Sequence, residues 1–293
     1  MARFEHLLAA TDLSAPARHA ADRAASVART IGATLDLIHV APTTTLDSLQ
    51  RFMAGLPADL PERWLAESET ALRTLAATLE GQHGVAAGVH LATGALLEEI
   101  TRLAGTLPAD LVVLGARGNS FLRHRVLGST AERLLSTAVR PMLIVKQVAH
   151  RPYASVLLPV DLSDVSLATL QCAAAVAPGA RITVLHAFEA PFEGQLRFAG
   201  VADKVIEDYR LGVRREAEER MRALYERAGL KPSEAQPVLV HGDPARCILE
   251  QEQERDCDLI VVGKRQGRLE DLFLGSVTRR VLAESQCDVL VSV

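Results

Sequence analysis

An internal duplication constrains this chain more than any other feature of its sequence. The run Asp258-Leu-Ile-Val-Val-Gly263 in the second half repeats Asp110-Leu-Val-Val-Leu-Gly115 in the first, and Asp161 stands where Asp12 stands. The two halves match at an offset of roughly 148 residues, whereas solenoid repeats span roughly 20 to 50 residues. The sequence therefore predicts two copies of a complete domain rather than an array of short units.

The predicted domains occupy residues 1–148 and 152–293, with a short polar stretch between them. Each is long enough to bury a core of its own. Because the chain is 48% hydrophobic but only 4% aromatic, that core is expected to be aliphatic. The expected strands, such as Leu111-Val-Val-Leu114, are apolar almost throughout. Strands of this kind are buried on both faces, which indicates a parallel sheet between two layers of helices.

The first half is expected to alternate strands with helices, and the second half to repeat this order. The strands are expected at residues 4–10, 33–40, 85–91, 111–114 and 141–146. Helices are expected from Ser14 to Thr30, at 62–79, at 95–104 and from Thr130 to Thr137, with Gly32, Gly81 and Gly84 as stop signals.

The stretch that follows the fourth expected strand carries the strongest indication of function. The chain breaks at Gly115 and Gly118, reaches Gly128 after nine further residues, and meets Ser129 and Thr130 at the start of a helix. Glycines let the backbone approach a ligand, and the first N–H groups of a helix lack internal partners. A strand, a glycine loop and a helix N-terminus together predict an anion site, with phosphate as the guest. The alternative is that these glycines only shape turns.

Two common phosphate-binding motifs are absent. A dinucleotide-binding domain carries G-x-G-x-x-G after its first strand, where this chain has Thr11-Asp-Leu-Ser14. A Walker A motif requires a glycine upstream of Gly-Lys and a hydroxyl residue after it, and Gly263-Lys264 has neither.

The residues resemble the universal stress protein family. The resemblance lies in Asp12, the pattern Gly115-x2-Gly118-x9-Gly128-Ser129 and the closing Arg140-Pro-Met-Leu-Ile-Val145, and it extends to both halves. It implies two tandem flavodoxin-like (adenine nucleotide α-hydrolase-like) domains, each a five-stranded parallel sheet of order 3-2-1-4-5 with flanking helices. It also implies an intramolecular pseudo-dimer joined through the last strands, with a further homodimer of chains left open.

The resemblance further implies that the cleft of the first domain binds ATP. The implied contacts are Asp12 and Val40 with the adenine, Gly115 near the ribose, and Gly118, Gly128, Ser129 and Thr130 with the phosphates. Arg117 is a candidate phosphate clamp, with a solvated side chain as the alternative. Mg²⁺ is expected because ATP usually carries it, and no metal ligand or catalytic residue is assigned to the chain.

The second half departs from this pattern. Three residues separate Gly263 from Gly267, where the first half has two, and Ala187 and Val277 replace Val40 and Thr130. A change of one residue in a phosphate loop moves N–H groups by more than hydrogen bonds tolerate. The second site is therefore a weaker candidate, and its residues are Asp161, Gly263, Lys264, Gly267, Gly275 and Ser276.

Other polar residues are expected to stabilise the fold rather than bind a ligand. Asp12 and Asp161 are alternatively turn or cap residues that compete with the neighbouring serines. His39 and His186 are expected to be buried and hydrogen-bonded, and Asp243 to cap a helix. The four cysteines form no C-x-x-C pair and are expected to be reduced thiols.

The expected function is that of an ATP-binding regulatory protein of the stress response that acts on an unidentified protein partner. The net charge of −4 argues against nucleic acid, and no apolar run is long enough to span a membrane, so a cytoplasmic location is expected. One alternative is a weak ATPase, or an enzyme that phosphorylates its own Ser129 or Thr130. A scaffold without nucleotide is the other.

Overall fold

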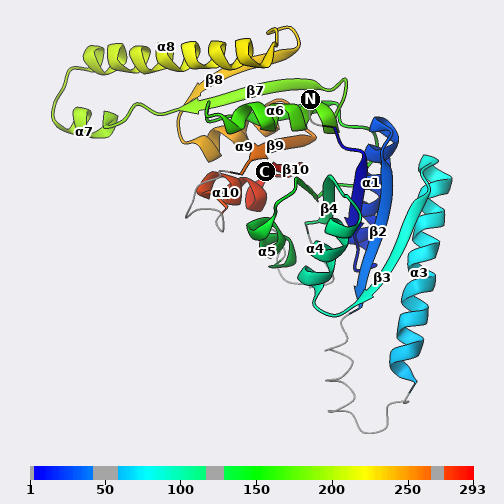
Figure 1. The fold of residues 1–293 in the computed structure, drawn as a ribbon. Helices are drawn as coiled ribbons and strands as arrows, with labels where there is room; N and C mark the ends of the chain where they lie inside the picture. Colours follow the sequence, from blue (N-terminus) through cyan, green and yellow to red (C-terminus); the bar gives the residue numbers. More distant parts are fainter. Residues whose placement is uncertain (1–2, 42–58, 117–128, 265–273) are drawn as a thin grey trace.

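The structure, a computed structural model, describes residues 3–41, 59–116, 129–264 and 274–293 (Figure 1). Within these ranges ten strands form one sheet, in the order β3-β2-β1-β4-β5-β10-β9-β6-β7-β8. Nearly all neighbouring strands are parallel, and helices pack on the sheet. The predicted α/β class is therefore confirmed.

The elements follow the alternation expected from the sequence. In the first half they are β1 (His6–Ala10), α1 (Ala15–Ile31), β2 (Thr34–Ala41), α3 (Leu60–His83), β3 (Ala87–Thr93), α4 (Leu96–Thr106), β4 (Leu111–Gly115), α5 (Ser129–Thr137) and β5 (Met142–Val145). In the second half they are β6 (Ser155–Pro159), α6 (Val165–Val176), β7 (Arg181–Phe188), α7 (Glu193–Phe198), α8 (Asp203–Ala228), β8 (Ala235–His241), α9 (Pro244–Glu254), β9 (Leu259–Gly263), α10 (Ser276–Glu284) and β10 (Asp288–Ser292).

The two halves join edge to edge. Each has the predicted strand order, β3-β2-β1-β4-β5 in the first half and β8-β7-β6-β9-β10 in the second. The last strands, β5 and β10, pair antiparallel with Leu143 opposite Leu290. Because equivalent strands run in opposite directions at this seam, the carboxyl edges of the two halves face opposite ways.

Alternate residues of each buried strand serve two cores. On β1, Leu7 belongs to a cluster that includes residues of α1 and α3, whereas Leu8 belongs to one with Ile100 of α4 and Leu135 of α5. Both leucines are fully buried. This alternation follows from the period of two in a strand, and it explains why the strands are apolar on both faces.

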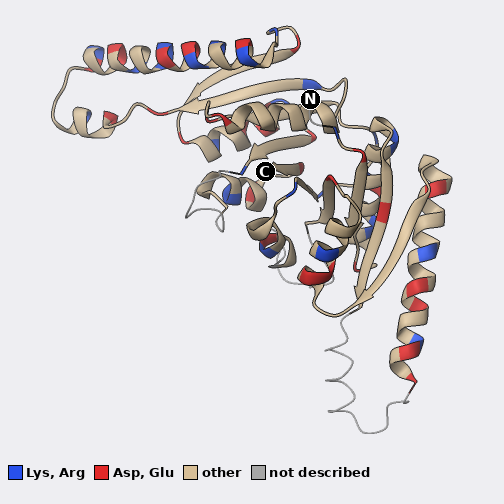
Figure 2. Cartoon of the chain, in the orientation of Figure 1, with Lys and Arg blue, Asp and Glu red and all other residues tan. Residues whose placement is uncertain are grey.

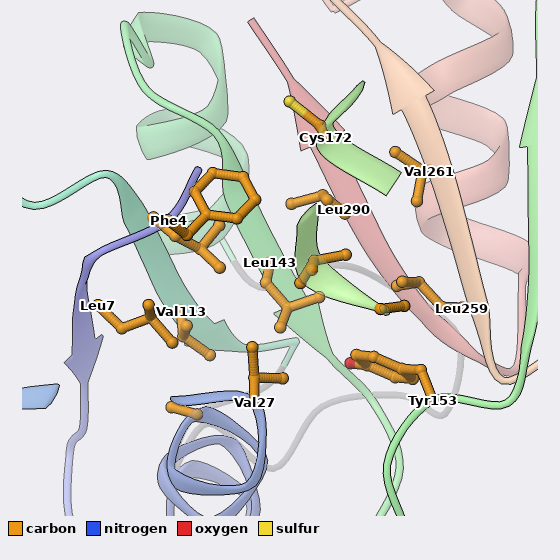
Figure 3. Packing of buried hydrophobic residues seen from close by; sticks show 14 of the residues in the cluster. Phe4, Leu7, Val27, Val113, Leu143, Tyr153, Cys172, Leu259, Val261 and Leu290 are labelled. Atoms are coloured by element: carbon orange, nitrogen blue, oxygen red, sulfur yellow. The ribbon is translucent and has the colours of Figure 1, made fainter. Parts of the chain in front are cut away.

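The first of these clusters crosses the seam. Figure 3 shows Leu143 and Leu290 near one another, with Val113 of the first half and Leu259 of the second half in the same cluster. All four side chains are fully buried. The two halves thus share one continuous apolar layer.

Local signals account for several helix ends. Ser14 caps α1 by accepting from the N–H of Ala17, and Gly32 ends this helix at φ +72°. Gly84 ends α3 at φ +68°, but Gly81 lies inside that helix, so the stop expected at Gly81 is wrong. A glycine in helical conformation costs only about 1 kcal/mol, which the packing of α3 on the sheet overcomes.

The helix α8 is the most highly charged element of the second half. Figure 2 shows acidic and basic residues along its length, and Arg214 pairs with Glu218 one turn away. Its buried residues lie mainly toward the C-terminal end, where Met221 and Leu224 join the core. The charged face of α8 is therefore a solvated surface.

A buried ion pair crosses the seam. The carboxylate of Asp288, at the start of β10, is fully buried and lies 3.1 Å from Nε of Arg23 on α1. The hydroxyl of Tyr153 donates to the same carboxylate at 2.7 Å, and the N–H groups of Lys146 and Gln147 donate to its other oxygen. The guanidinium of Arg23 also lies 4.3 Å from the centroid of the Tyr153 ring. The negative charge of Asp288 can be buried because several donors contact its carboxylate.

We expect Asp288→Asn to lower the free energy of unfolding by about 3 kcal/mol, because it leaves the Arg23 charge buried without its partner. Urea denaturation followed by circular dichroism measures this. The double variant Arg23→Met with Asp288→Asn is the control and is expected to recover part of the loss. Equal stability of Asp288→Asn and the unaltered protein would contradict the prediction.

A second prediction concerns Gly88 on β3, which lies against the carboxylate of Asp36 on β2. A Cβ at Gly88 would lie 1.9 Å from Oδ1 of Asp36. We expect Gly88→Ala to lower the free energy of unfolding by about 1 to 3 kcal/mol, since the strand and the carboxylate must move apart. The control is Gly105→Ala on α4, where the added methyl meets open space and stability is expected to hold or rise. Denaturant titration compares the two variants, and similar effects would refute the steric explanation.

Candidate functional site

Three neighbouring strands of the first half bring the predicted residues to one edge of the sheet. β1 lies between β2 and β4, with Ala10 opposite Ile38 on one side and Leu114 on the other. Asp12 follows β1, Val40 lies near the end of β2, and Gly115 ends β4. In an open parallel sheet, ligands bind where the strand order reverses, and here that point lies between β1 and β4.

The chain leaving β1 is fixed to β2. The N–H of Thr11 donates to the carbonyl of Ile38 at 2.9 Å, and Nδ1 of His39 donates to the carbonyl of Thr11 at 2.8 Å. His39 is 6% exposed, so the predicted buried and hydrogen-bonded imidazole is confirmed. This ring sets the backbone from which Asp12 projects.

Asp12 lies in a tight turn at this edge. Its Oδ1 accepts from the N–H of Ser14 at 3.0 Å, and Leu13 between them has φ +64°, an uncommon value for a residue with a side chain. Ser14 therefore caps α1, and Asp12 stabilises the turn before it. Asp12 is also solvent-exposed at the carboxyl edge.

The structure describes the residues on either side of the loop that is predicted to bind phosphate. Gly115 ends β4, and the N–H of Ala116 donates to the carbonyl of Val145 at 2.8 Å. α5 begins at Ser129, and its Ala131 packs in the same buried cluster as Leu114. The remaining predicted residues, Arg117, Gly118 and Gly128, lie outside the described residues.

The second half repeats the turn after its first strand. Leu162 has φ +61°, and Nδ1 of His186 donates to the carbonyl of Val160 at 2.8 Å. Burial lowers the pKa of His186. Oδ1 of Asp161 accepts from the N–H and hydroxyl of Ser163, at 3.0 and 2.6 Å, and from the hydroxyl of Ser166 at 3.2 Å. The duplication thus extends to the hydrogen bonds of the turn, since Oδ1 of each aspartate accepts from the N–H of the serine two residues later.

The glycines of the second half have different surroundings. A Cβ at Gly263 would lie 2.7 Å from Oγ1 of Thr169, so α6 closely covers the end of β9. Gly275 precedes α10, where an added Cβ would meet nothing within 4 Å, and Ser276 is the first residue of that helix. Gly267 lies outside the described residues.

Lys264 makes contacts that the sequence did not predict. Its side chain is 7% exposed, and its Nζ donates to the carbonyl oxygens of Ser136 and Ala138, at 3.0 and 3.2 Å. These carbonyls belong to the C-terminal end of α5 in the other half. The ammonium group that suggested a phosphate contact in the second half is therefore bonded across the seam.

Another polar cluster lies away from the carboxyl edge. The carboxylate of Asp36 on β2 lies 2.6 Å from Nε2 of His6 on β1 and 2.5 Å from Nε2 of His90 on β3. Sequence reasoning missed it, because the three residues are brought together only by the strand register. In the part of the chain that the structure describes, no group of three or more His, Cys, Asp or Glu is arranged to hold a metal ion.

A sequence model of the universal stress protein family matches the chain twice, over residues 3–146 and 152–292. The chain belongs to the universal stress protein family. It holds two tandem domains of that family, in agreement with the resemblance drawn from the glycine pattern.

The predicted helix cap at Asp243 is also confirmed. Its carboxylate accepts from the N–H of Arg246 at 2.9 Å, at the start of α9.

Curated relatives align with about half of the chain. Universal stress protein A homolog 1 from Coxiella burnetii is 32% identical over 48% of this chain and 96% of its own length. Universal stress protein YxiE from Bacillus subtilis is 29% identical over 47% of this chain and 98% of its own length. Nearly the whole length of each of these relatives therefore corresponds to about half of this chain.

A solved structure matches the whole fold. The crystal structure of a universal stress protein from Archaeoglobus fulgidus superimposes with a TM-score of 0.70 at 21% identity, covering 98% of this chain and 97% of that one. The likeness extends over both halves together.

None of the helices in the described part of the chain combines the length and the apolar character that a membrane span requires.

All four cysteines are buried, and burial raises the pKa of each thiol. We expect a thiol reagent such as DTNB at pH 8 to label the folded protein slowly and to label four thiols per chain once guanidinium unfolds it. The absorbance of the released thiolate gives the count. Fast labelling of any thiol before unfolding would contradict the prediction.

Proposed function

We propose that the first half binds ATP at the carboxyl edge formed by β2, β1 and β4, and that the chain acts as a nucleotide-binding regulatory protein of the stress response. The observation that carries this proposal is the convergence of Asp12, Val40 and Gly115 on the point where the strand order reverses. The helix α5, which begins next in the chain, supplies a positive N-terminal end.

The chemistry of the edge suits an adenine at one end. Val40 is 8% exposed and Ala41 is fully buried, so the end of β2 is apolar, as the surroundings of a base require. Asp12 is exposed next to it and carries acceptor oxygens for an exocyclic amine or a sugar hydroxyl. An apolar wall with a few polar groups is typical of a small-molecule site.

The other end suits phosphate. Gly115 is half-buried where β4 ends, and α5 begins with Ser129 and Thr130. Backbone N–H groups in the first turn of a helix, together with hydroxyl side chains, bind phosphate oxygens. We include Arg117, Gly118 and Gly128 in the proposed site on the sequence pattern alone.

Magnesium would enter with the nucleotide. Mg²⁺ commonly keeps several waters and binds through one or two carboxylates and the phosphates of its substrate, so a dedicated protein cage is not required. The proposed role of the chain's own residues is to hold the base and orient the phosphates.

We propose that the second half binds nucleotide less well. Its loop differs in length, Val277 replaces a hydroxyl residue, and the Lys264 ammonium is bonded to α5. Asp161, Gly263, Gly267, Gly275 and Ser276 remain its candidate contacts. About one ATP per chain is therefore expected.

We also propose that the two halves act as an intramolecular pseudo-dimer. The antiparallel pairing of β5 with β10 supports this, since it joins equivalent edges of two similar sheets. In this arrangement, nucleotide in one half is able to influence a surface that both halves form, which suits a regulatory role toward a protein partner.

The test is mass spectrometry of small molecules released when the purified protein is denatured, combined with calorimetric titration with Mg-ATP. We expect about one ATP per chain. At a ligand concentration of about 100 times Kd, binding is expected to add about 2.7 kcal/mol to stability and to raise the melting temperature accordingly.

The matched variants are Gly118→Ala in the first half and Gly267→Ala in the second. Gly118→Ala is expected to abolish binding and Gly267→Ala to leave it intact, because the added methyl obstructs only the loop in which it sits. The absence of nucleotide, together with no thermal shift on adding Mg-ATP, would reject the proposal in favour of a scaffold without nucleotide.

A further inference from the structure

Two lysines cross the seam to the ends of equivalent helices. Nζ of Lys264, at the end of β9, donates to the carbonyls of Ser136 and Ala138 at the end of α5. Nζ of Lys146, which follows β5, donates to the carbonyls of Leu282 and Ser285 at the end of α10, at 2.8 and 2.9 Å. Each half thus supplies a cation to the C-terminal end of a helix in the other half.

A cation is expected to stabilise the C-terminal end of each of these helices. Neither α5 nor α10 has a basic residue in its last turn. The last carbonyls of a helix have no partners within it and carry partial negative charge, so that a cation beside them is stabilising. Because Lys264 is 7% exposed, its bonds to α5 are shielded from competing water.

A shallow surface pocket lies at the C-terminal end of α5. It is bordered by Ile100 of α4, Leu134 and Thr137 of α5, and Met142 of β5. Val139, just beyond the helix, is 77% exposed. The chain that follows α5 is therefore exposed on its own side, whereas Lys264 contacts this end of the helix from the second half.

The same helix reaches the proposed phosphate site at its other end. α5 has only 9 residues, from Ser129 to Thr137. In a helix this short, a shift of the C-terminal end is transmitted to the N–H groups of the first turn. Contacts with phosphate oxygens tolerate only small displacements.

We propose that Lys264 is a positioning residue for the nucleotide site of the first half. Its ammonium group fixes the C-terminal end of α5 and thereby sets the position of Ser129 and Thr130 at the phosphates. This inference rests on the proposed function of the first half. It gives the second half a role in nucleotide binding that requires no nucleotide of its own.

The experiment titrates Mg-ATP into the full chain by calorimetry and compares Lys264→Met with Lys146→Met. Both variants remove one lysine from a helix end across the seam, so a general loss of stability affects them alike. We expect Lys264→Met to raise the Kd of the first half about tenfold and Lys146→Met to change it less than twofold. Lys264→Arg, which keeps the charge, is expected to restore most of the affinity.

Each other outcome has a distinct meaning. If the unaltered chain binds no Mg-ATP, the proposed function fails and the inference fails with it. If the unaltered chain binds but Lys264→Met leaves Kd unchanged, only the inference is overturned. The same holds if Lys146→Met weakens binding equally. A fall in the number of bound ATP molecules at constant Kd would make Lys264 a ligand of the second half and would also overturn it.

Discussion

Pairing between β5 and β10 is the interaction on which the rest of this structure depends. It places Leu143 against Leu290 and makes one sheet from two, so that neither half leaves its last strand as an exposed edge. The pairing also buries the carboxylate of Asp288, which is held by Arg23 of one half and Tyr153 at the start of the other. Because an unpaired charge is costly in such a place, the ion pair favours this arrangement of the halves over alternatives with a shifted register.

The duplicated backbone and the diverged side chains serve different purposes. Leu13 and Leu162 have nearly the same positive φ value, and the histidines of the two halves bind equivalent carbonyls. The turn that holds the aspartate therefore has the same geometry in each half. At the seam the symmetry ends, since Cys172 stands in the repeat where Arg23 stands. The turns lie at the carboxyl edge of each half and are built by that half alone, whereas the seam joins residues that differ on its two sides.

The sequence predicted what is encoded locally. The apolar runs and the repeat predicted the strands and the two domains, and the resemblance to the family implied the strand order. The caps of Ser14 and Asp243 followed from residue type and position. The error at Gly81 arose because a glycine signals a helix end only where packing does not outweigh its cost. The contacts of Lys264 and the Arg23–Asp288 pair join residues far apart in the chain, and a lysine beside a glycine has the same local pattern whether it faces phosphate or a helix end.

Lys264 illustrates how a second domain changes role without changing fold. Its N–H donates to the carbonyl of Ser292, as the N–H of Ala116 donates to the carbonyl of Val145, so the backbone is equivalent in the two halves. Only the side chain differs, because alanine ends at the methyl while lysine reaches across the seam. A substitution at one position therefore ties the second half to α5 and leaves the sheet intact. This difference agrees with both proposals, that the second half binds nucleotide less well and that Lys264 positions the site of the first half.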